Sequence, residues 1–224
     1  SFAGLGSATR GFPVVEYLLW SHGDQTLATL MENPRRCRVL AGAATDVHNN
    51  AELLVQEWTQ QWIPRLTEPE TIEGNEYDSA KEVLDEWVNR MGFTVENIRL
   101  TKLGKPVGDE ADGRPQPDTI ESRYSARSLT DARDALLGVR DVWTGQVGQG
   151  TLGIRDLVRD QELIVRMDEQ LQAAVDSLAD VPETLEMSAM DDPGSIAAAQ
   201  QPLLKIQILV QADLADSLGA EITF

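Results

Sequence analysis

Apolar residues recur every three or four positions along almost the whole chain, and this spacing constrains the fold more than any other feature. Such spacing places apolar side chains on one face of an α-helix. No stretch has the strict alternation typical of a half-buried strand. The sequence therefore predicts an all-α protein built from helical bundles. The clearest example is the stretch 78–103, with apolar residues at Val83, Leu84, Trp87, Val88, Met91, Val95, Ile98 and Leu103.

Proline and glycine mark the ends of the expected helices. Asn33 followed by Pro34 is typical of a helix start, and this longest helix is expected to extend to about residue 66. Gly104 and Pro106 are expected to end the helix over 78–103. Residues 104–119 form the one obvious loop, which is either a functional segment or a linker between bundles. Further helices are expected over 128–143, 163–178 and 195–218, the last of them central and well buried.

Charge and composition exclude several classes of function. The chain has 19 basic and 37 acidic residues, a net charge of −18, and no basic block longer than Arg35-Arg36. Nucleic acid is excluded as a partner, because binding phosphates requires a cationic surface. No apolar run is long enough for a transmembrane segment. The single Cys37 and the two histidines exclude a thiolate zinc cage or a histidine-rich metal centre. The five tryptophans are interpreted as core packing.

Glu16 is the most informative carboxylate in the sequence. It lies within the apolar run Phe12 to Trp20. A carboxylate in such surroundings is either paired or part of a site, because an unpaired buried charge is costly. Two interpretations follow: a salt bridge with an arginine, or a metal ligand and site carboxylate.

The two histidines have simpler interpretations. His22 follows the run that contains Glu16, six residues further on, and is either a surface or capping residue or a metal ligand beside Glu16. His48 lies in the middle of a long expected helix, where a position on the polar face is expected.

A donor-rich segment precedes the helix expected at Ser128. Arg123, Ser125 and Ser128 could bind an anion together with the N–H groups of the helix start. The alternative is helix capping combined with an ion pair to the acidic surface. From the residues alone, an enzyme would have to use Glu16, one histidine and this segment.

Three stretches together resemble the imelysin family of bacterial cell-envelope proteins. The run from Gly11 to Trp20 is similar to the family's Gly-x-His-x-x-Glu signature, and keeps Gly11 and Glu16. The segment from Tyr124 to Asp131, followed by Gly138 and Trp143, resembles the family's serine-rich approach to a helix. Residues 209–219 resemble its closing helix, so that the resemblance spans most of the chain in the right order.

The resemblance implies a fold, a location and a role. It implies one imelysin-like domain of two related bundles, with residues 1–106 as the remainder of the first and 107–224 as the second. The signature would line a cleft between them, giving Gly11, Pro13, Glu16, Arg123, Ser125 and Ser128 as ligand-binding residues. It also implies a periplasmic or cell-envelope location, in some relatives with a lipid anchor, and a role in iron or haem acquisition. Some family members are described as metallopeptidases.

Two departures from the family pattern modify these expectations. Pro13 stands where the signature has histidine, and proline offers no lone pair to a metal. Peptidase activity is therefore not expected unless His22 or His48 replaces the missing ligand beside Glu16, with iron or zinc as the metal. The signature also arrives early, at residue 11, so the first bundle is expected to be incomplete and covered by an upstream segment or a second chain. A purely structural or interaction module is the third alternative.

Overall fold

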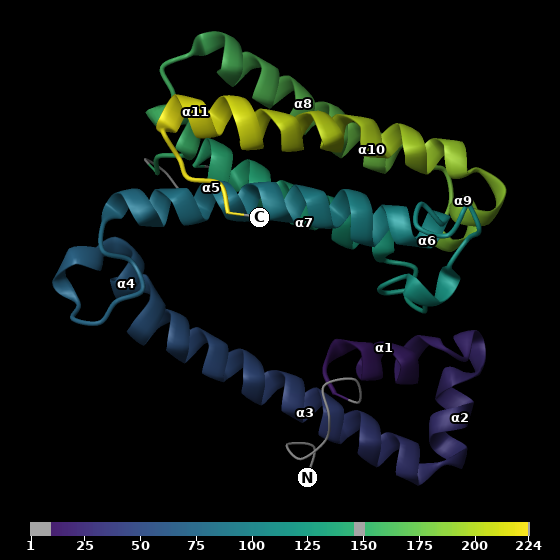
Figure 1. Cartoon of the computed structure of the whole chain (residues 1–224). Helices are drawn as coiled ribbons and strands as arrows, with labels where there is room; N and C mark the ends of the chain where they lie inside the picture. Colours follow the sequence, from purple (N-terminus) through teal and green to yellow (C-terminus); the bar gives the residue numbers. More distant parts are fainter. Residues whose placement is uncertain (1–9, 146–150, 224) are drawn as a thin grey trace. The chain divides into compact units, whose positions relative to one another are not determined.

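The computed structural model describes residues 10–145 and 151–223, and every regular element in these ranges is a helix (Figure 1). This confirms the all-α class. None of the helices in these two ranges is long and apolar enough to cross a membrane. The chain divides into two compact units, here called unit 1 (Ser1–Ala80) and unit 2 (Lys81–Phe224).

Unit 1 is organised around one long helix. Asn33 begins α3 (Pro34–Glu57), because its side-chain oxygen accepts bonds from the backbone N–H groups of Arg35 and Arg36. The expected helix to residue 66 is confirmed, since α3 continues through a π-helical segment (Trp58–Trp62) into α4 (Ile63–Thr67). The remaining helices, which both contact α3, are α1 (Phe12–Trp20) and α2 (Thr26–Glu32).

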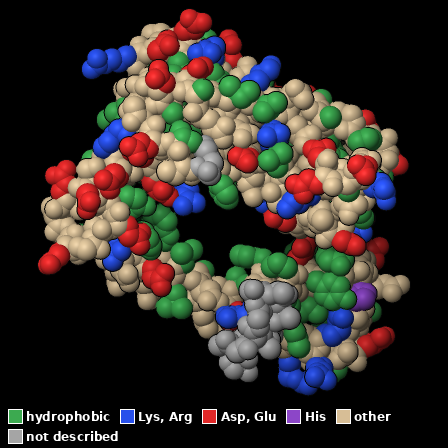
Figure 2. Space-filling view, viewed as in Figure 1, with side chains coloured by type: hydrophobic (Ala, Val, Ile, Leu, Met, Phe, Trp, Pro, Cys, Tyr) green, Lys and Arg blue, Asp and Glu red, His purple; other side chains and the backbone are tan. Residues whose placement is uncertain are grey.

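Unit 1 buries few side chains. Among its described residues only Leu18, Ala43 and Pro69 are buried. Large apolar side chains on α1 and α3 remain exposed, and Figure 2 shows hydrophobic side chains at the surface over α1 and near α4. Unit 1 by itself therefore has little hydrophobic core.

Unit 2 is a bundle with a continuous core. Its most extensive helix–helix packing joins α10 to α8 and α7 to α8, and Figure 1 shows α10 alongside α8. Its elements are α5 (Ala80–Glu96), a π-helical segment (Asn97–Gly104), α6 (Lys105–Val107), α7 (Ser128–Thr144), α8 (Gln161–Ala179), α9 (Leu185–Asp191), α10 (Pro193–Ile208), a second π-helical segment (Leu209–Leu214) and α11 (Ala215–Leu218).

The core of unit 2 comes from the apolar stripes that the spacing predicted. Leu136 and Trp143 of α7, Met167 of α8 and Leu203 of α10 are all fully buried. The last helical stretch is confirmed as central, because Ile196, Leu203, Ile206, Val210 and Leu214 have no exposed surface. Fully burying one such side chain contributes about 1.5–3 kcal/mol.

The prediction that Gly104 ends a helix is wrong. The helix passes through the π-helical segment Asn97–Gly104 and continues as α6. It ends at Gly108, which adopts the left-handed conformation (φ 89°) typical of helix ends. Gly104 is needed for packing instead, because a Cβ on it would lie 2.7 Å from the Asp109 carboxylate and 3.1 Å from the Arg99 carbonyl. The expected loop is correspondingly shorter.

The interpretation of all five tryptophans as core residues is also wrong. Only Trp143 is fully buried, whereas Trp20, Trp58 and Trp87 are 49%, 43% and 39% exposed. Each of these three side chains is partly covered and keeps a large exposed surface.

The boundary between the units differs from the expected division at 106/107. It lies between Ala80 and Lys81. The physical reason is that Val88, Met91 and Val95 of α5 belong to the core of unit 2. Whether the units are two related bundles stays a prediction.

Candidate functional site

The signature-like run forms the start of α1. Gly11 lies before the helix with φ 81°, and Pro13 lies in the first turn, where a missing N–H costs nothing. Glu16 follows three residues later, so positions 13 and 16 share one face of the helix. A histidine at position 13 would place a nitrogen donor beside the Glu16 carboxylate, whereas Pro13 offers only carbon atoms on this face.

An ion pair anchors this run to α3. The Arg10 guanidinium donates from Nε to Asp46 Oδ2 over 2.9 Å and from Nη2 to Oδ1 over 2.6 Å. This bidentate hydrogen bond holds the pKa of Asp46 below its ordinary value, and the added charge attraction acts in the same direction. The Arg10–Asp46 pair thus fixes where Gly11 and the first turn of α1 lie on α3.

Arg36 of α3 faces Tyr17 of α1. Its guanidinium carbon is 5.9 Å from the centroid of the Tyr17 ring, within reach of a cation–π contact. Arg36 Nε and Nη2 are buried and have no hydrogen-bond partner among the described residues. The carboxylate of Glu16, one residue before Tyr17, is partly buried.

The described residues of unit 1 do not supply the ligand set of a catalytic metal. His22 is exposed after α1, and exposed His48 faces Glu52 at 3.5 Å on the polar side of α3, as its helix position predicted. No group of three His, Cys, Asp or Glu side chains able to hold a metal ion exists among the described residues. A catalytic zinc needs three protein ligands, and Pro13 supplies none of them. Metal ligation by Glu16 and His22 stays a prediction.

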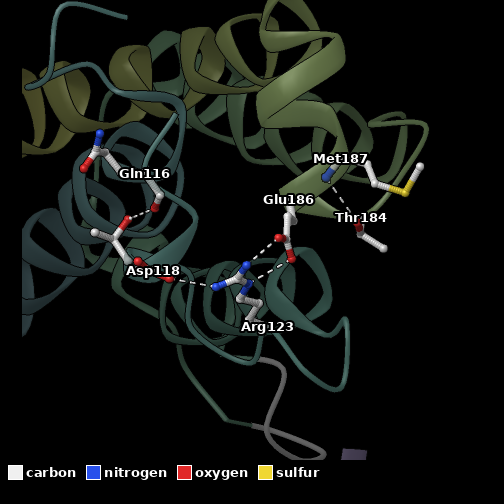
Figure 3. Close-up of polar contacts among 7 residues, drawn as sticks. Gln116, Asp118, Arg123, Thr184, Glu186 and Met187 are labelled. Carbon is white, nitrogen blue, oxygen red and sulfur yellow. Dashed lines mark hydrogen bonds and ion pairs between the residues drawn. The ribbon is translucent and has the colours of Figure 1, made fainter. Parts of the chain in front are cut away.

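Arg123 joins the segment before α7 to α9 (Figure 3). It donates from Nε and Nη2 to the two oxygens of Glu186, at 2.9 and 2.6 Å, and from Nη1 to Asp118 at 2.9 Å. These hydrogen bonds lower the pKa of Glu186 and raise that of Arg123. All three nitrogens of the guanidinium are engaged, which favours the ion-pair alternative over anion binding.

The two serines of this segment also bond locally. Ser128 is buried at the start of α7 and donates to the Glu121 carbonyl, while Ser125 donates to the Ser122 carbonyl over 3.3 Å. These hydroxyl groups close the turns that lead into α7. A role for Ser125 and Ser128 in binding a ligand stays a prediction.

The predicted site residues are divided between the two units. Gly11, Pro13, Glu16 and His22 lie in unit 1, and Arg123 to Ser128 lie in unit 2. Within unit 1, Pro13 and Glu16 lie one turn apart on α1, whereas His22 lies beyond the end of this helix.

Sequence reasoning missed the carboxylates that hold the two arginines. Asp46 lies 36 positions from Arg10, and Glu186 lies 63 positions from Arg123. No local pattern reveals such pairs. A signal for α9 was present, because Thr184 accepts from the Met187 N–H at 3.3 Å as a typical helix cap (Figure 3).

Comparisons with known proteins show the family of this chain. The imelysin model of peptidase family M75 matches residues 2–211. The chain is 24% identical over 196 residues to iron-regulated protein A of Synechococcus elongatus, covering 84% of this chain. It spans about half of that relative, 52% of its length. No solved structure matches the chain. With the family model covering nearly all of its length, the chain belongs to the imelysin family.

Proposed function

We propose that this protein is a non-enzymatic, ligand-binding imelysin that works in iron or haem acquisition at the cell envelope. The observation that carries the proposal is the altered signature: Gly11 and Glu16 are kept, while Pro13 removes the histidine. The name of the cyanobacterial relative, which is iron-regulated, supports the connection with iron. The family supports the envelope location.

The proposed binding residues are those at the start of α1. Glu16 is partly buried there, in a helix that the Arg10–Asp46 pair fixes on α3. A fixed carboxylate is suited to an iron species that arrives with other ligands already attached, since the protein then has to supply only one donor. Arg123, Ser125 and Ser128 act, in this proposal, by holding the start of α7 in place.

The test is calorimetric titration of the protein with Fe(II), ferric citrate, haem, Zn(II) and Cu(II). We expect one iron species to bind, and Glu16→Ala to weaken that binding at least tenfold. Glu57→Ala is the matched control, because it removes an exposed carboxylate from the same unit at the end of α3. Circular dichroism of each variant checks that the helices are intact.

Two results would overturn the proposal. The first is the absence of binding by every iron species, which would favour a structural or interaction module. The second is stoichiometric Zn(II) binding together with peptide hydrolysis, which would show that another residue replaces the missing ligand. Pro13→His sharpens the test, because it restores a nitrogen donor one turn from Glu16 and should strengthen Zn(II) binding.

A further inference from the structure

A cavity of about 380 Å³ lies within unit 2, and none of the predicted site residues is among the described residues that line it. Its described lining comes from α5, the end of α7 and residues 151–157. This volume lies in the range of small-molecule sites. The described residues that line it are Trp87, Asp141, Val142, Gly145, Thr151, Leu152, Gly153, Ile154 and Leu157.

Two glycines build the wall of this cavity. Gly145 ends α7 in the left-handed conformation (φ 70°), and a Cβ on it would lie only 2.4 Å from the Gly153 nitrogen. The Thr151 hydroxyl donates to the Gly145 carbonyl, and the Gly153 N–H donates to Asp156 at 2.8 Å. The backbone here is closely packed and hydrogen-bonded, so the wall is a built feature of the fold.

The lining combines apolar walls, one aromatic ring and one charge. Val142, Leu152 and Leu157 supply aliphatic surface, and Trp87 of α5 is 39% exposed although neighbouring Val88 is fully buried. Asp141 is the only charged residue among the described lining, and it makes no ion pair with any described residue. Its carboxylate thus lacks the arginine partner that Asp168 and Asp213 of the same unit have.

This combination has a definite chemical preference. An indole ring attracts a cation through its negative face, and a nearby carboxylate adds direct charge attraction. Aliphatic walls favour a ligand with an apolar body. The net charge of −18 raises the local concentration of cations and opposes anions.

We propose that this cavity binds a small organic cation with an apolar body, of the arylalkylamine class. Asp141 would pair with the ammonium group, and Trp87 would contact the body of the ligand. The proposal stands apart from the proposed function at Glu16, because it rests on residues of unit 2 alone.

Three probes with the same phenyl body separate charge from shape: phenethylamine, 2-phenylethanol and phenylacetate. Ligand-detected saturation-transfer NMR of the intact protein measures the affinity of each. We expect phenethylamine to bind about tenfold more tightly than 2-phenylethanol, as one added charge contact would give, and phenylacetate to bind more weakly than either.

Variants of the lining residues assign the effect to the cavity. Asp141→Asn should remove the preference for the amine and leave the binding of 2-phenylethanol unchanged. Trp87→Ala should weaken both, and Trp87→Phe should restore part of the loss. Asp180→Asn is the matched control, since Asp180 is an exposed carboxylate of the same unit that does not line the cavity.

Three results would overturn the proposal. They are equal binding of the three probes, an unchanged amine preference in Asp141→Asn, and no binding of any probe by the natural protein. Amide NMR spectra of each variant confirm that its fold is native. A failure here leaves the proposal at Glu16 untouched, because the two experiments use different ligands and different residues.

Discussion

The two units have the same kind of helical sequence pattern but very different interiors. Unit 2 has a core in which Trp143, Met167 and Leu203 are fully buried, while unit 1 buries only Leu18, Ala43 and Pro69 among its described residues. An apolar stripe on a helix shows that the helix needs a neighbour. It does not show that a neighbour is there. The difference also means that side chains of equal size should contribute unequally to stability.

The largest expected effect contrasts two leucines. Leu203→Ala in α10 opens a cavity in the core of unit 2 and should lower the free energy of unfolding by about 2–5 kcal/mol. Leu54→Ala in α3, where the side chain is 56% exposed, should change it by less than about 1 kcal/mol. Urea unfolding followed by circular dichroism measures both. Equal losses would show that Leu54 is packed in solution.

The next effect contrasts two glycines of unit 2. Gly145→Ala combines a left-handed backbone with a Cβ 2.4 Å from the Gly153 nitrogen, and should destabilise the protein by about 2 kcal/mol or more. Gly138→Ala has open space around the new Cβ within α7, and should stabilise by about 0.5–1 kcal/mol. Thermal unfolding of both variants gives the comparison. A neutral Gly145→Ala would contradict the close approach of the two glycine backbones.

A smaller effect depends on pH. The pKa of Glu186 is lowered in the folded state by its hydrogen bonds to Arg123, so the ion pair stabilises fully above the unfolded pKa of a glutamate. This stability, about 1 kcal/mol for a partly exposed pair, should be lost as the pH falls through the lowered pKa. In Glu186→Gln, the free energy of unfolding should therefore fall less between pH 6 and pH 3 than it does in the natural protein.

A pH titration of urea midpoints checks this, with Glu183→Gln as control. An unchanged acid profile in Glu186→Gln would show that the pair with Arg123 is not formed in solution. The Arg10–Asp46 pair of unit 1 titrates in the same direction, because the pKa of Asp46 is also lowered. Asp46→Asn therefore extends the test to the other unit.

The smallest expected effect concerns Arg36. Because Nε and Nη2 of its guanidinium are buried without a partner among the described residues, Arg36→Met replaces unsatisfied donors by an apolar group of similar length. The melting temperature should stay the same or rise slightly. Arg10→Met, which breaks a bidentate pair, should lower it. A clear loss in Arg36→Met would reveal a partner for this guanidinium.

Much of the fold was predictable from local pattern. The helix cap at Asn33 and the apolar stripe of α10 depend only on residues close by in the sequence, so the sequence alone indicates both. The continuation of the helix past Gly104 was not predictable, because it depends on a π-helical segment and on the packing of Gln200 against the Arg99 carbonyl. The exposure of Trp58 likewise depends on what surrounds the helix.

The candidate site was predicted less well, for the same reason. The altered signature at Pro13 is visible in the sequence, and the structure adds that positions 13 and 16 share a helix face. The partner of Arg123 could not be predicted, because Glu186 comes from a helix 63 positions away. Pairs of this kind are set by tertiary packing, which leaves no local signal.

Hydrogen exchange of backbone amides tests the central contrast between the two units most directly. We expect strong protection across α10, whose apolar face is fully buried, and weak protection across residues 47–57 of α3, whose large apolar side chains are exposed. Mass spectrometry of peptides from both helices gives the two rates in one experiment. Equal, strong protection of both helices would contradict the contrast between the units, because it would show that α3 is packed as deeply as α10.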